Sequence, residues 1–177
     1  MNINSKFGAG LIVVAILITA IGSIGITTKD SAEDIPTPNV QGSVYFSDEP
    51  ARSNPLALFI SANAEITWDR EEVFLVVADE DKKQQCNGLS FIERMNQNGE
   101  TCTSRDNEFE AVGDDNESGF IWSVESGEYY FGIGSFQDLS SDFELNVDYE
   151  VKMTLSPAGY FATFLMLISG FVLNKYQ

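Results

Sequence analysis

Two runs of carboxylates are the side chains of this chain best suited to binding a cation. One run holds Asp79 and Asp81 at the end of a predicted strand, and the other holds Asp114 and Asp115 in a predicted turn. Calcium takes several oxygen ligands, but neither run has the spacing of an EF-hand loop. Neighbouring carboxylates on one loop also cannot all face one ion. The pattern therefore favours a solvated acidic surface, with a calcium site as the alternative, and it predicts no other cofactor.

The chain has no histidine, which is the commonest catalytic base near neutral pH. Ser-His-Asp and Cys-His sites are therefore excluded, and no glycine-rich loop with a lysine follows a strand to hold a nucleotide. The 27 acidic and 10 basic residues give a net charge of −17, which disfavours contact with nucleic acid. These features predict a protein that is not an enzyme.

Two further patterns point to covalent modification. Cys86 and Cys102 are the only cysteines, and an even pair in an external domain usually forms a disulfide. Free buried thiols or half of a metal site are the alternatives, although a zinc site needs four ligands. Asn116 begins an Asn-Glu-Ser triplet, which is the acceptor pattern for N-glycosylation. The sequence thus predicts a disulfide and offers Asn116 as a glycosylation candidate.

Two uncharged segments flank the acidic part of the chain. Residues 7–28 and 153–174 contain no charged side chain, and a membrane-spanning helix needs about 20 apolar residues. We predict transmembrane helices at residues 7–28 and 157–174. A cleaved signal peptide is the alternative for the first segment, and an amphipathic or buried helix is the alternative for the second.

The charges predict how the chain crosses the membrane. Lys6 and Lys175 lie in the short tails 1–6 and 175–177, and positive residues favour the cytoplasmic side. Residues 30–156 carry 27 acidic and seven basic residues, which gives this segment a net charge of −20. We therefore expect an integral two-pass membrane protein with both termini in the cytoplasm and the central domain outside it.

Small residues recur at helical spacing in both apolar segments. Ala15, Thr19 and Ser23 follow one another at intervals of four in the first segment, and Ala158 and Ala162 do so in the second. Small residues on one face allow helices to approach closely in a bilayer. These five residues are therefore predicted to pack the two helices against each other or against another membrane protein.

Residues 41–156 are expected to form a β domain. Residues 143–155 alternate apolar and polar side chains, which is typical of a half-buried strand. Short strands separated by turn residues favour an antiparallel β-sandwich of jelly-roll type. We expect residues 29–40 to be a linker and residues 79–106 a polar excursion with a helical turn near residues 89–95. The other predicted strands are residues 42–47, 56–62, 73–78, 120–124 and 129–133.

One local stretch resembles a known family. Ser126-Gly127-Glu128-Tyr129-Tyr130-Phe131, followed by a loop and the strand 143–151, is similar to the G-x-Y-x-F hairpin of GOLD-type and pre-peptidase C-terminal β-sandwich domains. The resemblance covers about 30 residues. GOLD proteins are single-span receptors and cargo adaptors of secretory membranes, so the resemblance implies a sandwich used for protein contact. This chain differs from them by its first apolar segment and by its short tail.

Together these features predict a non-enzymatic, membrane-anchored protein. Its acidic extracytoplasmic β-sandwich would mediate protein–protein interaction as an accessory subunit or adaptor of a membrane complex. The expected partners are the lipid bilayer and another membrane protein or a second copy of the chain. The alternative is an extracytoplasmic module that binds calcium or a cationic ligand at its acidic loops.

Overall fold

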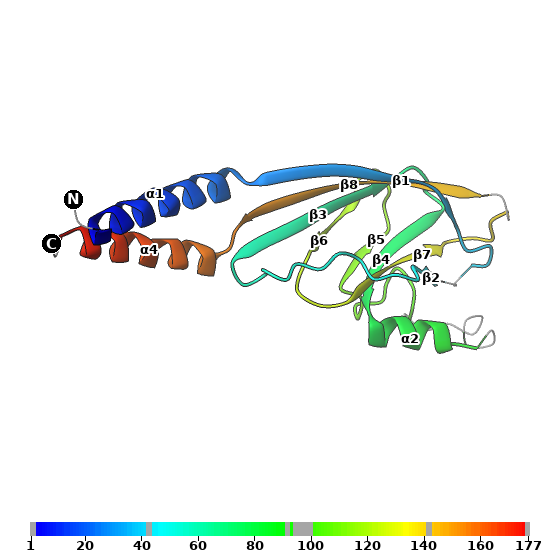
Figure 1. The fold of residues 1–177 in the computed structure, drawn as a ribbon. Coiled ribbons are helices and arrows are strands. Elements are labelled where there is room, and N and C mark those ends of the chain that lie inside the picture. Colours follow the sequence, from blue (N-terminus) through cyan, green and yellow to red (C-terminus); the bar gives the residue numbers. More distant parts are fainter. Residues whose placement is uncertain (1–2, 42–43, 91–92, 94–100, 141–142, 176–177) are drawn as a thin grey trace.

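The computed structural model describes residues 3–41, 44–90, 93, 101–140 and 143–175 (Figure 1). Two long helices lie at one end of the molecule and a β domain lies at the other, with both described chain ends at the far end of the helices. The elements are α1 (Ile3–Ile24), β1 (Ile26–Pro36), β2 (Val44–Phe46), β3 (Ile60–Trp68), β4 (Val73–Asp79), α2 (Glu80–Gly88), β5 (Ala111–Gly113), β6 (Phe120–Ser123), β7 (Tyr129–Ser135), β8 (Glu144–Leu155) and α4 (Pro157–Lys175).

The strands form two four-stranded antiparallel sheets. Sheet A has the order β1-β8-β3-β6, and sheet B has the order β2-β7-β4-β5. Both sheets contribute side chains to one buried cluster, in which Ile66 and Trp122 of sheet A meet Val73 and Leu75 of sheet B. A smaller cluster on sheet B joins Phe74 and Val76 to the segment that carries α2. The mainly β architecture predicted from the sequence is therefore confirmed.

The hydrophobic pattern explains why β8 and β4 take their places. In β8, Leu145 is fully buried, and Val147 and Val151 pack against the main core, while Glu144, Asn146 and Asp148 face solvent. Alternation of this kind gives one covered face. Every residue of β4 except Asp79 is buried, because β4 lies between β7 and β5 and is covered on both faces.

Two apolar helices of the expected kind are present. Residues Lys6–Ile24 and Pro157–Lys175 are long and apolar enough to cross a membrane. The second helix begins at the predicted residue, but the first ends at Ile24 rather than at residue 28. Gly25 has a φ of +84°, which ends α1, and the β-branched residues that follow favour a strand.

The expected linker at residues 29–40 is wrong, because most of it belongs to β1. Ile26 pairs with Met153 of β8 and Pro36 pairs with Glu144, with a bulge between Ala32 and Ile35. All of β1 except Ile35 is exposed, so its sequence lacks the alternation that marks a buried strand. Backbone pairing with β8 holds β1 in place.

The region 79–106 also differs in detail. Its helix is α2 at Glu80–Gly88, which comes earlier than the helical turn expected near residues 89–95. Most of that expected turn lies outside the described residues. Parts of the two tails and the start of the strand expected at 42–47 also lie outside them. Strand β3 begins at Ile60, four residues later than expected, because residues 55–59 form turns. The proposed hairpin of residues 126–131 and 143–151 is not formed, since β7 and β8 lie in different sheets.

Candidate functional site

The two apolar helices lie against each other as an antiparallel pair (Figure 1). Gly8 of α1 and Gly170 of α4 lie where the two backbones approach closely. A Cβ atom at Gly8 would lie 2.8 Å from the carbonyl oxygen of Gly170, and a Cβ at Gly170 would lie 2.9 Å from that of Gly8. Only glycine fits at both positions without moving a backbone, so the close packing of the two helices depends on these two glycines.

The residues predicted to pack the helices are placed in different ways. Ala15 is fully buried, and the half-buried Thr19 donates a hydrogen bond to its carbonyl oxygen at 2.8 Å. Ser23 is exposed, and its Oγ accepts a hydrogen bond from the Tyr160 hydroxyl at 3.1 Å. On α4 the predicted Ala158 and Ala162 are only half-buried. The buried residues of α4 are Gly159, Thr163 and Gly170.

Both junctions between helix and strand are fixed by specific contacts. At the first, the amide N–H of Gly25 donates to the carbonyl oxygen of Ile21 at 2.9 Å, and a Cβ on Gly25 would lie 3.0 Å from the carbonyl oxygen of Met153. At the second, Ser156 caps α4, since its Oγ accepts a hydrogen bond from the amide N–H of Gly159 at 3.1 Å. Pro157 then occupies the first helical position, which it favours. A single residue therefore joins each helix to its strand, Gly25 at the first junction and Ser156 at the second.

The acidic runs proposed for calcium are not brought together. Asp79 ends β4 and caps α2 by accepting a hydrogen bond from the amide N–H of Lys82 at 2.7 Å, and Asp81 lies in the first turn of α2. Asp114 and Asp115 lie between β5 and β6, where Asp115 accepts a hydrogen bond from the Ser118 hydroxyl at 2.6 Å. Because Leu75 pairs with Gly113 and Val77 with Ala111, the two runs lie at opposite ends of β4.

Within the described part of the chain, no group of three or more His, Cys, Asp or Glu side chains is placed where it could hold a metal ion. Asp79 and Asp81 line a shallow depression together with Lys82 and Glu108. The ammonium group of Lys82 would oppose a cation there. Calcium binding therefore stays a prediction from the sequence, since the described structure does not bring the four aspartates together as ligands of one ion.

A buried ionic cluster lies beside the disulfide, and sequence reasoning missed it. Cys86 of α2 and Cys102 form the predicted bridge. Lys82 Nζ lies 2.6 Å from Asp106 Oδ2 and 2.7 Å from Glu108 Oε2, and the side chains of Lys82 and Asp106 are each only 5% exposed. Lys82 stood in the sequence as one charge in a charged run, without a sign that it would be buried.

Hydrogen bonds satisfy the carboxylate of this cluster. Asp106 accepts from the amide N–H of Cys102 at 2.6 Å and from that of Glu108 at 3.0 Å. Burial alone would raise the pKa of Asp106, but the hydrogen bonds from Lys82 and from these two amides outweigh it and hold the pKa below its ordinary value. Burial would likewise lower the pKa of Lys82, and the bonds to Asp106 and Glu108 raise it instead. The cluster therefore anchors α2 to the loop before β5.

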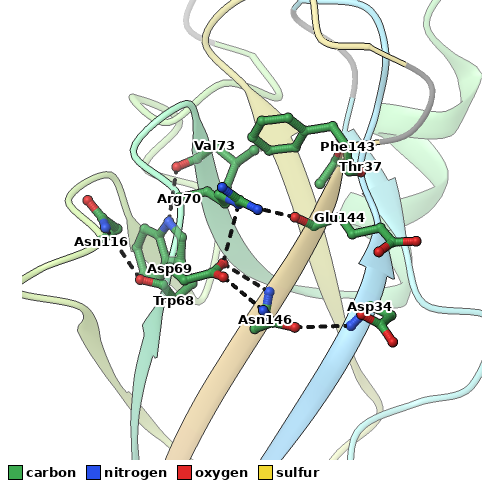
Figure 2. Close-up of polar contacts among 10 residues, drawn as sticks. All are labelled: Asp34, Thr37, Trp68, Asp69, Arg70, Val73, Asn116, Phe143, Glu144 and Asn146. Carbon is green, nitrogen blue, oxygen red and sulfur yellow. Dashed lines mark hydrogen bonds and ion pairs between the residues drawn. The ribbon is translucent and has the colours of Figure 1, made fainter.

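A second polar cluster, called the distal cluster here, ties three segments together at the end of β3 and β8 far from the helices. Figure 2 shows its contacts. The Asp69 carboxylate accepts hydrogen bonds from the backbone N–H and the side-chain amide of Asn146, at 3.0 and 2.8 Å. Asn146 Oδ1 in turn accepts from the amide N–H of Asp34 at 3.1 Å. Arg70 donates to the carbonyl oxygen of Glu144 at 3.3 Å. Burial would raise the pKa of Asp69, but the bonds from Asn146 and the charge of Arg70 lower it.

These contacts give the distal cluster a structural role. They join β1, β8 and the turn after β3, at the place where β1 has its bulge. Asp34 has a φ of 56°, which its bond to Asn146 accommodates. The Asp69 carboxylate and the Asn146 amide are both engaged with protein, so the arrangement fixes these strands against one another.

The glycosylation candidate lies beside this cluster. Asn116 is half-buried, and its Nδ2 donates to the carbonyl oxygen of Trp68 at 3.4 Å (Figure 2). A sugar would be attached to the same nitrogen. Glycosylation would therefore alter this contact, and its use stays a prediction.

Comparison with known proteins yields no family. No family model matches the chain, and no curated protein matches it. Similar solved structures include that of tomato aspermy virus, at 11% identity over 74% of this chain and 79% of that one, with a TM-score of 0.41. Another is PliG of Aeromonas hydrophila, a periplasmic inhibitor of g-type lysozyme, at 10% identity over 75% and 86% of the two chains and a TM-score of 0.26. Likenesses this weak carry no information on the role of the chain.

Proposed function

We propose that the protein is a non-enzymatic, membrane-anchored interaction protein that holds an extracytoplasmic β-sandwich on two transmembrane helices. One observation carries the proposal: the anchor and the domain are continuous. The helices pair through Gly8 and Gly170, and they lead directly into β1 and β8, which are neighbours in sheet A. A domain attached in this way is held at a fixed orientation to the membrane, which suits a subunit that positions a partner.

The strand order supports a jelly roll for this domain. The chain changes sheet at every connection except that between β4 and β5. An eight-stranded, two-sheet arrangement of this kind is typical of jelly rolls. The sequence has no histidine, and the contacts of the buried ionic cluster and of the distal cluster hold segments of the fold together. Both observations support a non-enzymatic role.

The helix surfaces support contact with lipid or with another membrane protein. Large apolar side chains on the outer faces of the pair are exposed, among them Val13, Ile16, Phe161 and Phe164. Lys6 and Lys175 at the ends of the helices support cytoplasmic termini. The partner would be a second membrane protein or a second copy of this chain, bound through these faces or through the acidic domain.

Site-specific photo-crosslinking in native membranes tests this function. A photoreactive residue would replace Phe164 on α4 in one variant and Ile121 on β6 in another, since both side chains are exposed. We expect at least one position to give a discrete product in which this chain is crosslinked to another protein chain. Mass spectrometry of the complex in mild detergent should show the same two proteins in a fixed stoichiometry. A chain that crosslinks only to lipid and runs as a single copy would contradict the proposal.

A further inference from the structure

An uncharged loop lies at the end of the domain that meets the helices. Residues 53–64 carry no charge in a domain whose net charge is −20. Three large apolar side chains in this stretch are exposed: Leu56 by 53%, Leu58 by 67% and Phe59 by 43%. Soluble surfaces rarely group such side chains without a partner. The loop is therefore a candidate interaction surface.

Contacts with α4 fix the height of this loop. Ile60 pairs with Leu155, the last residue of β8, so the loop before Ile60 lies level with the start of α4. The amide N–H of Ser156 donates to the carbonyl oxygen of Phe59 at 3.0 Å, and the Ser156 hydroxyl donates to that of Leu58. A Cβ on Gly159 would clash with the Phe59 carbonyl oxygen, so the loop touches the first turn of the helix.

Several backbone groups of the loop are already hydrogen-bonded within the protein. The carbonyl oxygen of Leu56 accepts from the amide N–H groups of Phe59 and Ile60, both at 2.8 Å. The Asn54 side chain accepts from the amide N–H of Leu56 at 3.2 Å and donates to the carbonyl oxygen of Ile60 at 2.7 Å. Backbone groups that are paired internally can enter a membrane interface without losing hydrogen bonds to water.

We propose that the loop 55–59 is a third membrane contact, in which Leu56, Leu58 and Phe59 insert into the boundary between lipid headgroups and acyl chains beside α4. Tyr160 in the first turn of α4 lies at the same level and is 40% exposed, and its hydroxyl donates a hydrogen bond to Ser23 near the end of α1. Aromatic residues at this position are typical of the membrane interface. The inference rests on the proposed membrane anchoring, and it adds a lipid contact made by the domain itself.

Nitroxide labels on the full chain in lipid nanodiscs test the proposal. Leu58→Cys carries the label in the loop, and Ile121→Cys is the matched control, because both native side chains are 67% exposed. The native cysteines are joined in a disulfide and do not take the label. We expect the label at residue 58 to be several-fold more accessible to oxygen than to a water-soluble nickel complex, and the label at residue 121 to show the reverse.

A third label separates failure of this inference from failure of the anchoring. Phe164→Cys on α4 reads as lipid-exposed if the helix spans the bilayer, and a water-like reading there would overturn the anchoring as well. A lipid-like label at residue 164 with a water-like label at residue 58 overturns the loop contact alone. A label at residue 58 shielded from both reagents also overturns it, since that result indicates a protein partner on the loop.

Discussion

At the scale of single residues, the pair Lys82 and Asp106 offers the sharpest test of what holds the domain together. Asp106→Asn keeps the shape of the side chain but leaves the buried ammonium of Lys82 with Glu108 alone, whose side chain is 65% exposed. Removing one partner of a buried ion pair is strongly destabilising, so we expect a loss of about 3 kcal/mol in the free energy of unfolding.

Denaturant unfolding of the full chain in nanodiscs measures this loss, because Trp68 and Trp122 are buried in the main core and their fluorescence reports on the domain. Asp114→Asn is the matched control, as it makes the same chemical change at an exposed residue. We expect the control to alter the free energy of unfolding by less than about 0.5 kcal/mol. Equal effects from the two variants would rule out a stabilising role for the buried pair.

The same carboxylate predicts how stability depends on pH. The pKa of Asp106 in the folded protein lies below its ordinary value of 3.8, so its ionised form stabilises the fold above that pH. This contribution is lost as the pH falls through the folded pKa. We expect the difference in unfolding free energy between the wild type and Asp106→Asn to be constant from pH 5 to 7 and to shrink below about pH 4. A difference that stays constant in acid would contradict this cause.

At the scale of helices and strands, the glycine contact between α1 and α4 can be tested with a substitution in the same helix. Gly8→Leu places a side chain against the backbone of Gly170, whereas Gly10→Leu is the control, because a Cβ there meets no atom within 4 Å. Overpacking of this kind costs about 1–3 kcal/mol. We therefore expect Gly8→Leu to separate the helices and Gly10→Leu to leave them paired.

Spin labels at Val14→Cys and Phe164→Cys report the separation, since both side chains are exposed on the outer faces of the pair. Double electron–electron resonance should show a longer and broader distance distribution for Gly8→Leu than for Gly10→Leu. If the two variants gave the same distribution, the close approach of Gly8 and Gly170 would not determine the pairing.

These elements also show what sequence patterns can and cannot predict. The alternation in β8 and the apolar run of β4 were found because burial on one face or on both leaves a direct trace in the sequence. Strand β1 left no such trace, since nearly every side chain in it is exposed and its stability comes from pairing with a segment over 100 residues away. Backbone pairing of this kind has no counterpart in local composition.

The candidate sites likewise divide into those that residue type predicts and those that depend on contacts across the fold. The disulfide and the two apolar helices follow from residue type alone. The engagement of Lys82 with Asp106, and of Asp69 with Asn146, depends on which strands become neighbours. The approach of Gly8 to Gly170 likewise depends on how the helices rotate against each other. Contacts across the fold therefore became visible only with the arrangement of the strands and helices.

At the scale of the whole molecule, the continuity of β1 and β8 with the helices predicts a domain that stands away from the membrane. Thr27 and Glu33 are both exposed on β1, and six residues of strand separate them by about 20 Å along its axis. A donor dye on Thr27→Cys should transfer energy to acceptor-labelled lipid headgroups more efficiently than the same dye on Glu33→Cys. A net charge of −20 on residues 30–156 further opposes contact with anionic lipid.

The measurement has a clear opposite outcome. A domain that folds back onto the bilayer would bring both dyes to similar distances from the headgroups, and their transfer efficiencies would then agree. Insertion of flexible Gly-Ser segments at both junctions, between Gly25 and Ile26 and between Leu155 and Ser156, serves as the control, because it removes both fixed attachments while leaving the dye positions on β1.

The position of β8 in sheet A sets the order in which the protein can be completed. β8 lies between β1 and β3, yet it follows all the other strands of the two sheets in the chain. Strand β1, already tethered behind the first helix, has no neighbour until residues 144–155 have been synthesised. The second apolar helix emerges immediately afterwards, so closure of sheet A and synthesis of α4 are almost simultaneous. A chain cut short before residue 144 would therefore lose an inner strand of sheet A and one of the two apolar helices together.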